Sequence, residues 1–201
     1  YKPIDLSKID KSLFVASMLD STLQSSIYDG KSYGVPHIWG TSGLIVNSEK
    51  AADVKDYTDL CNDAYMGKVT YRLKRPTLIA FAFAAYNDPA EYEKIMLKVQ
   101  DKLISCKGNV KAYWSGGDAM KNLMRTDETV AAMAWDAGGW QLHDDNQAIN
   151  FIAPTSGALG WIDAFVIPRK SKNESAAYKW INFVMQPKIA AMITDAAGNF
   201  T

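Results

Sequence analysis

Two pairs of tryptophan and aspartate are the residues of this sequence best suited to hold a charged ligand. Trp135 directly precedes Asp136, and Trp161 stands two residues before Asp163. A carboxylate accepts charge-assisted hydrogen bonds from an ammonium group, and an indole face adds a cation–π contact of about 0.5–2 kcal/mol. Strand alternation would put Trp161 and Asp163 on one face. The pattern favours recognition of an amine; the alternative is a core tryptophan beside a turn-capping carboxylate.

The sequence shows no motif for a nucleophile with a nearby base, and none for binding a nucleotide. The two histidines, His37 and His143, are far apart and stand in turn-like contexts, and no GxSxG motif occurs. The GTSG at 40–43 indicates a turn, and no Walker A or GxGxxG motif precedes a helix. We therefore predict a binding protein rather than an enzyme, and we expect no cofactor.

The two cysteines cannot build a metal site by themselves. Cys61 and Cys106 form no CxxC motif, and a structural zinc needs four ligands. They would form one disulfide in an oxidising compartment, or remain two buried thiols. Both alternatives stay open, and no metal is expected.

Composition excludes several classes of protein. The 201 residues allow one large domain or two small ones, and 48% hydrophobic with 22% charged residues excludes intrinsic disorder as the main state. Lysine plus arginine and aspartate plus glutamate both number 22, so a strongly basic nucleic-acid surface is not expected. No apolar run approaches the roughly 20 residues of a membrane span. The chain opens on YKPIDLSKID without a signal-peptide pattern, and we expect it to be a fragment.

Strand and helix patterns alternate along the chain, which predicts an α/β fold. The expected strands cover 68–73, 109–114, 129–135 and 150–153; within 31–47 a turn at 34–36 precedes a strand, and 156–168 is expected to be a loop followed by a strand. The expected helices cover 51–60, 76–86, 88–106, 119–125, 175–185 and 188–197, and 136–139 is expected to be a loop with room for a ligand. Because ligands bind beyond the carboxyl ends of strands in such sheets, residues following the strands at 68–73 and 129–135 are candidates.

Several motifs, in order, resemble a known family. AMAWDAGGW, PTSGALGWIDAFVIPRKSKN and AAYKWINFVMQPKIAAMIT look like segments of the bacterial spermidine/putrescine-binding proteins, the periplasmic receptors of polyamine ABC transporters. YGVPHIWGTSGLIVN is similar to the family's first interlobe strand, and YTDLCNDAYMGKV to its next helix–turn–strand. The resemblance covers essentially the whole chain.

The resemblance implies an α/β, type II periplasmic-binding-protein fold with two lobes and a ligand cleft at the hinge. Residues 1–46 and 165–201 would form an incomplete lobe one, and 47–164 would form lobe two. It implies a periplasmic or lipid-anchored receptor that binds a small amine without chemistry. Its partner would be an ABC permease complex in the inner membrane; we expect the full-length receptor to be a monomer that binds no nucleic acid. The alternatives are an enzyme or a sensor lipoprotein on the same scaffold.

The resemblance also implies roles for individual residues. Trp161 and Asp163 fall on the family's aromatic–x–Asp motif. In that motif the aspartate binds an amine group of the ligand, and the aromatic ring stacks on the ligand's alkyl chain. Trp135 falls on another stacking tryptophan, with Asp136 beside it. Trp39, on the strand similar to the first interlobe strand, completes this predicted ligand-binding set.

One segment departs from the family pattern. Where polyamine receptors carry an acidic cluster, this sequence has RLKRPT, with Arg72, Lys74, Arg75 and Thr77. A helix start favours anions, and a second ammonium there would meet like charges at a cost of about 4 kcal/mol at ~4 Å. We therefore predict a ligand with an amine at one end and a carboxylate or neutral polar group at the other, such as γ-aminobutyrate, as the alternative to spermidine or putrescine. If the basic side chains point to solvent, Thr77 merely caps the helix.

Overall fold

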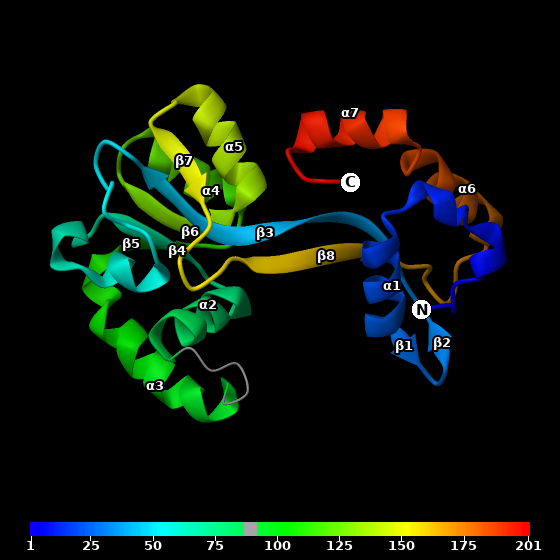
Figure 1. Ribbon diagram of the computed structural model, residues 1–201, viewed down its shortest axis with the longest axis horizontal. Helices are drawn as coiled ribbons and strands as arrows, with labels where there is room; N and C mark the ends of the chain where they lie inside the picture. Colours follow the sequence, from blue (N-terminus) through cyan, green and yellow to red (C-terminus); the bar gives the residue numbers. More distant parts are fainter. Residues whose placement is uncertain (87–91) are drawn as a thin grey trace. The chain divides into compact units, whose positions relative to one another are not determined.

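The computed structural model describes residues 1–86 and 92–201, which divide into two compact units. Unit 1 comprises Tyr1–Gly40 and Trp161–Thr201, and unit 2 comprises Thr41–Gly160. The chain passes from one unit to the other within strands β3 (Val35–Asn47) and β8 (Leu159–Phe165) (Figure 1). The predicted lobe boundaries at 46/47 and 164/165 fall in the same two strands, and they stay a prediction.

A mixed sheet forms the centre of unit 2. Its strand order is β5-β4-β6-β3-β7, and β8 pairs with β3. The other strands are β4 (Val69–Arg72), β5 (Val110–Trp114), β6 (Ala131–Trp135) and β7 (Ile149–Ile152). Strand β4 runs parallel to both β5 and β6, whereas β3 is antiparallel to β6 and β7. The last residues of β4, β5 and β6 therefore lie at the same edge of the sheet.

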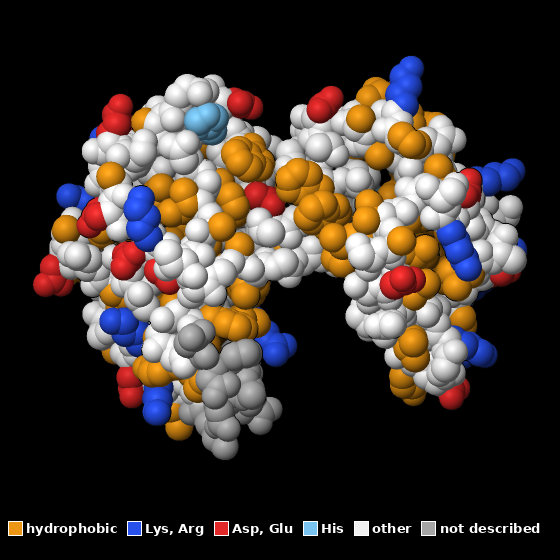
Figure 2. Space-filling view, viewed as in Figure 1, with side chains coloured by type: hydrophobic (Ala, Val, Ile, Leu, Met, Phe, Trp, Pro, Cys, Tyr) orange, Lys and Arg blue, Asp and Glu red, His pale blue; other side chains and the backbone are white. Residues whose placement is uncertain are grey.

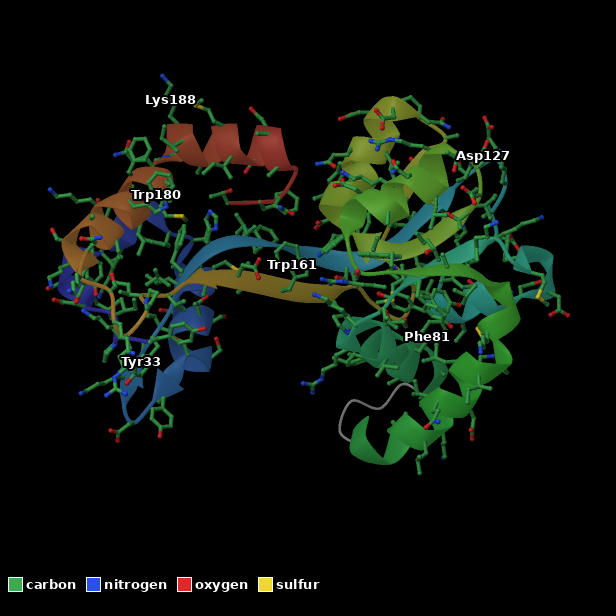
Figure 3. The ribbon with its side chains drawn as sticks, turned by 180° about the vertical axis from the view of Figure 1, so that it is seen from behind. Tyr33, Phe81, Asp127, Trp161, Trp180 and Lys188 are labelled. Atoms are coloured by element: carbon green, nitrogen blue, oxygen red, sulfur yellow. A yellow bond between two sulfur atoms is a disulfide. The ribbon has the colours of Figure 1, made fainter. Side chains whose placement is uncertain are left out.

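Helices cover both faces of this sheet (Figure 1). On one face lie α2 (Arg75–Tyr86) and α3 (Tyr92–Ser105), and on the other lie α4 (Gly117–Arg125) and α5 (Asp136–Asp145). The apolar run of α2 buries Phe81 fully, against the rings of Tyr57 and Tyr71 (Figure 3). The helix expected over 76–86 is confirmed, and the start of the helix expected over 88–106 lies outside the described residues.

Several local expectations were wrong. The GTSG at 40–43 and His37, both expected in turns, lie inside β3, and His143 lies in α5. The helix expected over 51–60 is replaced by a 3-10 helix at Tyr57–Cys61, because Asp56 and Asp59 form a capping box that starts a short helix there. The loop expected over 136–139 is instead the first turn of α5. Gly139 allows this helix to lie close to β7, since a Cβ atom at that position would stand 2.6 Å from the Cβ of Phe151.

Unit 1 has its own apolar core. Its helices are α1 (Ala16–Ser25), α6 (Glu174–Val184) and α7 (Pro187–Ala197), and its short strands are β1 (Ile27–Tyr28) and β2 (Lys31–Ser32). Buried side chains of the N-terminal segment, of Val35 and Ile167, and of α6 pack together in this core. Helix α7 ends at Ala197 and is capped by Gly198, whose φ of 73° is in the left-handed region that glycine adopts readily. Phe200 then forms two backbone hydrogen bonds with Trp39 of β3.

A disulfide joins two segments of unit 2. Cys61, at the end of the 3-10 helix, is bonded to Cys106, which follows α3, with their Cα atoms 4.8 Å apart. Of the two alternatives for the cysteines, the structure contains the disulfide.

Candidate functional site

An arginine and two tryptophans meet at the carboxyl edge of the unit 2 sheet. The guanidinium carbon of Arg72 lies 4.4 Å from the ring centroid of Trp135 and 5.7 Å from that of Trp114. The two indole rings are 4.9 Å apart. Each of the three residues is the last of its strand, so the parallel register brings them together. The indole predicted to stack on a ligand therefore already contacts a cation of the protein itself.

Asp136 holds the start of α5 in place. It is 2% exposed, and its Oδ2 accepts hydrogen bonds from the N–H and the hydroxyl of Thr41, while Oδ1 accepts one from the N–H of Ala137. These are the bonds that the capping interpretation requires. The role of Asp136 as a ligand contact stays a prediction.

The basic segment after β4 separates into exposed and buried members. Lys74 and Arg75 are exposed, whereas Thr77 is buried and its hydroxyl donates to the carbonyl of Arg72. This bond ties the first turn of α2 to the end of β4, but the hydroxyl donates and does not cap the helix, and the role of Thr77 as a ligand contact stays a prediction. A cavity of about 300 Å³ opens beside this turn. Its lining includes Tyr71, Arg72, Leu73, Lys74, Thr77 and Tyr113.

Unit 1 carries the second group of predicted residues. Trp161 and Asp163 alternate correctly along β8 to share one face, and Trp161 extends from this strand in Figure 3. Trp161 is half-buried and Asp163 is exposed. Trp39 of β3 stacks on Phe200, with ring centroids 4.7 Å apart and planes inclined by 28°. Unit 1 therefore contains a stacked pair of aromatic rings, a half-buried indole and an exposed carboxylate.

Sequence reasoning missed His37 as part of this region. Its imidazole packs on Phe165 with ring centroids 4.1 Å apart. Burial lowers the pKa of His37 below its ordinary value, and the negative charge of Asp163 offsets part of that shift. The available signal was spacing: His37 stands two residues before Trp39 on one strand, and Phe165 two residues after Asp163 on another.

Charges of both signs are interspersed on the face shown in Figure 2, as expected for a chain with zero net charge. Within residues 1–86 and 92–201, no group of three or more histidine, cysteine, aspartate or glutamate side chains could hold a metal ion. No helix in that part of the chain is long and apolar enough to cross a membrane.

Comparisons with known proteins agree with this architecture. The spermidine/putrescine-binding periplasmic protein of Escherichia coli is 28% identical over 200 residues, covering 96% of this chain and 57% of the relative. A Listeria monocytogenes structure assigned to a spermidine/putrescine ABC transporter superposes with a TM-score of 0.85 at 25% identity, covering 100% of this chain and 62% of that one. A Treponema pallidum lipoprotein shares the fold, with a TM-score of 0.83 at 22% identity, covering 98% and 62%.

The chain thus spans about 57% of the length of this Escherichia coli relative. The α/β periplasmic-binding-protein fold expected from the sequence is confirmed by the structural likeness. The sequence model of the bacterial extracellular solute-binding protein family matches residues 2–201, nearly the whole chain. This family binds solutes without catalysis, in agreement with the prediction that the chain is not an enzyme. The chain belongs to the bacterial extracellular solute-binding protein family.

Proposed function

We propose that this chain is part of the solute receptor of an ABC importer and binds a small amine outside the cytoplasmic membrane. The observation that carries the proposal is the shared face of Trp161 and Asp163 on β8. The name of the Escherichia coli relative, a spermidine/putrescine-binding protein, supports a ligand of this kind. The partner would be a membrane permease, and the receptor would be periplasmic or lipid-anchored.

The chemistry of the Asp163 side chain supports amine binding. Within the described residues, no hydrogen bond or ion pair engages its exposed carboxylate. A ligand ammonium would supply charge-assisted hydrogen bonds to these oxygens. The half-buried ring of Trp161 on the same face would contact the alkyl part of the ligand. Both features fit a short, flexible aliphatic amine.

Two ligand classes fit this description. One is a polyamine such as putrescine or spermidine, and the other is an amine–carboxylate such as an ω-amino acid. Cations stand at the end of β4 in unit 2, and an ammonium group placed beside one of them would be repelled by about 4 kcal/mol at 4 Å with an effective dielectric near 20.

A thermal-shift assay tests the proposed function. Spermidine, putrescine and γ-aminobutyrate are each added to the protein at the same concentration, with acetate and glucose as controls that carry no amine. A ligand at about 100 times its Kd stabilises the folded state by about 2.7 kcal/mol. We expect at least one amine, and neither control, to raise the melting temperature. A protein that responds to no amine would contradict the proposal.

A further inference from the structure

An apolar groove lies beside α3 in unit 2. It is a cavity of about 400 Å³ between α3, the start of α2 and β5, the strand at the edge of the sheet (Figure 1). The cavity of about 300 Å³ at the turn into α2 is adjacent, because the two have three lining residues in common. Both volumes are in the range of small-molecule sites. We call the larger cavity the α3 groove, defined by Leu78, Leu97, Leu103, Ile104, Lys107 and Tyr113.

Large apolar side chains are exposed along this groove. Leu97 is 74% exposed, Ile104 60% and Tyr113 50%. Leu97 and Ile104 are seven residues apart on α3, so they stand on the same side of the helix, about 10 Å apart along its axis. Contiguous apolar surface of this kind marks a site that another molecule covers. Because this surface extends along the helix, it suits an extended aliphatic chain better than a compact ring.

The charge at the α3 groove is positive. Among the described residues that line it, Lys107 carries the only charge, and this side chain is exposed. Lys107 follows the last turn of α3 and therefore stands at one end of the groove. Within residues 1–86 and 92–201, no ion pair or hydrogen bond engages its ammonium group. The groove thus combines aliphatic surface along α3 with an unpaired cation at one end.

We propose that the α3 groove is a second ligand site, which binds a medium-chain fatty acid with its tail along α3 and its carboxylate at Lys107. The apolar side chains remove the tail from water, and the ammonium group donates charge-assisted hydrogen bonds to the carboxylate. A cationic aliphatic ligand would instead be repelled at that end. This inference does not rest on the proposed function, because the groove lies wholly in unit 2, whereas Trp161 and Asp163 belong to unit 1.

Three probes test the inference: decanoate, decylammonium and butyrate. Decylammonium has the same chain as decanoate with the opposite charge, and butyrate has the same carboxylate on a short chain. Isothermal titration of the protein, with decanoate kept below the concentration at which it forms micelles, should show one bound decanoate per chain. The affinities for decylammonium and for butyrate should each be lower by about tenfold or more. Absence of decanoate binding, or equal affinities for decanoate and decylammonium, would overturn the proposal.

Matched variants place the bound molecule. Lys107→Gln should weaken decanoate by about tenfold, whereas Lys55→Gln makes the same charge change at an exposed position outside the groove and should leave the affinity unchanged. The double variant Leu97→Ser, Ile104→Ser should weaken decanoate by about tenfold or more, because it removes apolar surface from the groove. Met192→Ser, at an exposed position of α7, is its control. Decanoate affinity that neither groove variant changes would overturn the site.

A further variant covers the case in which Lys107→Gln does not fold, as judged by circular dichroism. Lys107→Arg keeps the positive charge and should retain most of the affinity for decanoate. An arginine variant that folds and does not bind decanoate would contradict recognition of the carboxylate by charge.

The amine assay separates this inference from the proposed function. The variants of the α3 groove should leave the thermal shift caused by amines unchanged, because the two sets of residues do not overlap. A protein that binds decanoate at the α3 groove but responds to no amine would overturn only the proposed function. A protein that responds to an amine but binds no decanoate would overturn only the second site.

Discussion

Asp136 accepts two hydrogen bonds from a single residue, Thr41. The N–H of Thr41 donates to Oδ2 over 2.7 Å, and its hydroxyl donates to the same oxygen over 2.9 Å. The other oxygen accepts the N–H of Ala137 over 2.8 Å. The carboxylate therefore ties β3 to the first turn of α5, next to the tryptophan that contacts Arg72.

Replacing this carboxylate should destabilise the fold. An asparagine at position 136 has one accepting oxygen, so Asp136→Asn cannot satisfy all three donors. We expect the free energy of unfolding in urea to fall by about 1–3 kcal/mol. Thr41→Val, which removes only the hydroxyl donor, should cost about 0.5–1.5 kcal/mol. An Asp136→Asn variant with unchanged stability and lost amine binding would show that Asp136 acts as a ligand contact instead.

The disulfide should contribute substantially to the stability of unit 2. Cys61 and Cys106 are separated by 45 residues, and closing a loop of that length restricts the unfolded chain. Replacing both cysteines with alanine should lower the free energy of unfolding by about 2–4 kcal/mol. Neither cysteine belongs to the proposed ligand contacts, so amine affinity should change little where the variant is folded. Equal urea midpoints for the variant and the oxidised protein would contradict this expectation.

Amine affinity should depend on the protonation of His37. Its pKa is lowered by burial, with a partial offset from Asp163, so the ring is neutral at pH 7. Below the pKa of His37, the positive imidazolium would interact with the negative charge of Asp163. It would therefore weaken the attraction of Asp163 for a ligand ammonium, and the affinity for amines should fall. Titrations between pH 5 and 8 should show this loss, and His37→Gln should flatten it. A pH profile that is the same in both proteins would exclude the effect.

The same residue has a consequence for stability. A histidine whose folded pKa lies below its unfolded value binds fewer protons when folded, so stability rises with pH in that interval. The contribution of His37 is therefore complete above about pH 6.5 and is lost as pH falls from there through its folded pKa. His37→Gln should reduce the pH dependence of the urea midpoint in this window. A midpoint in the unaltered protein that rises on acidification through this window would contradict the sign.

The α/β class and most strands could be predicted from the sequence because their patterns are local. Alternation at 68–73 and the apolar run at 129–135 need no tertiary information. The first turn of α5 could not be predicted, because two glycines normally indicate a loop. Because Gly139 has no side chain, the helix can pack closely against Phe151, and this contact exists only in the folded chain.

The candidate site was predictable in its residue types but not in its pairings. Spacing alone places Trp161 and Asp163 on one face. The sequence also locates four polar or basic residues at and just after the end of β4, but which of them contacts an indole depends on the strand register. That register puts Arg72 opposite Trp114 and leaves Lys74 and Arg75 exposed. The pairing of Trp39 with Phe200 joins residues far apart in the chain and carries no sequence signal.

The most direct test of amine recognition is the affinity of the protein for butylamine, with and without the Asp163 carboxylate. Asp163→Asn removes one charge from β8, and Asp20→Asn makes the same change at an exposed position of α1 as a control. Isothermal titration should show affinity reduced by about tenfold or more in Asp163→Asn and unchanged in Asp20→Asn. Equal affinities in all three proteins would contradict amine recognition by Asp163.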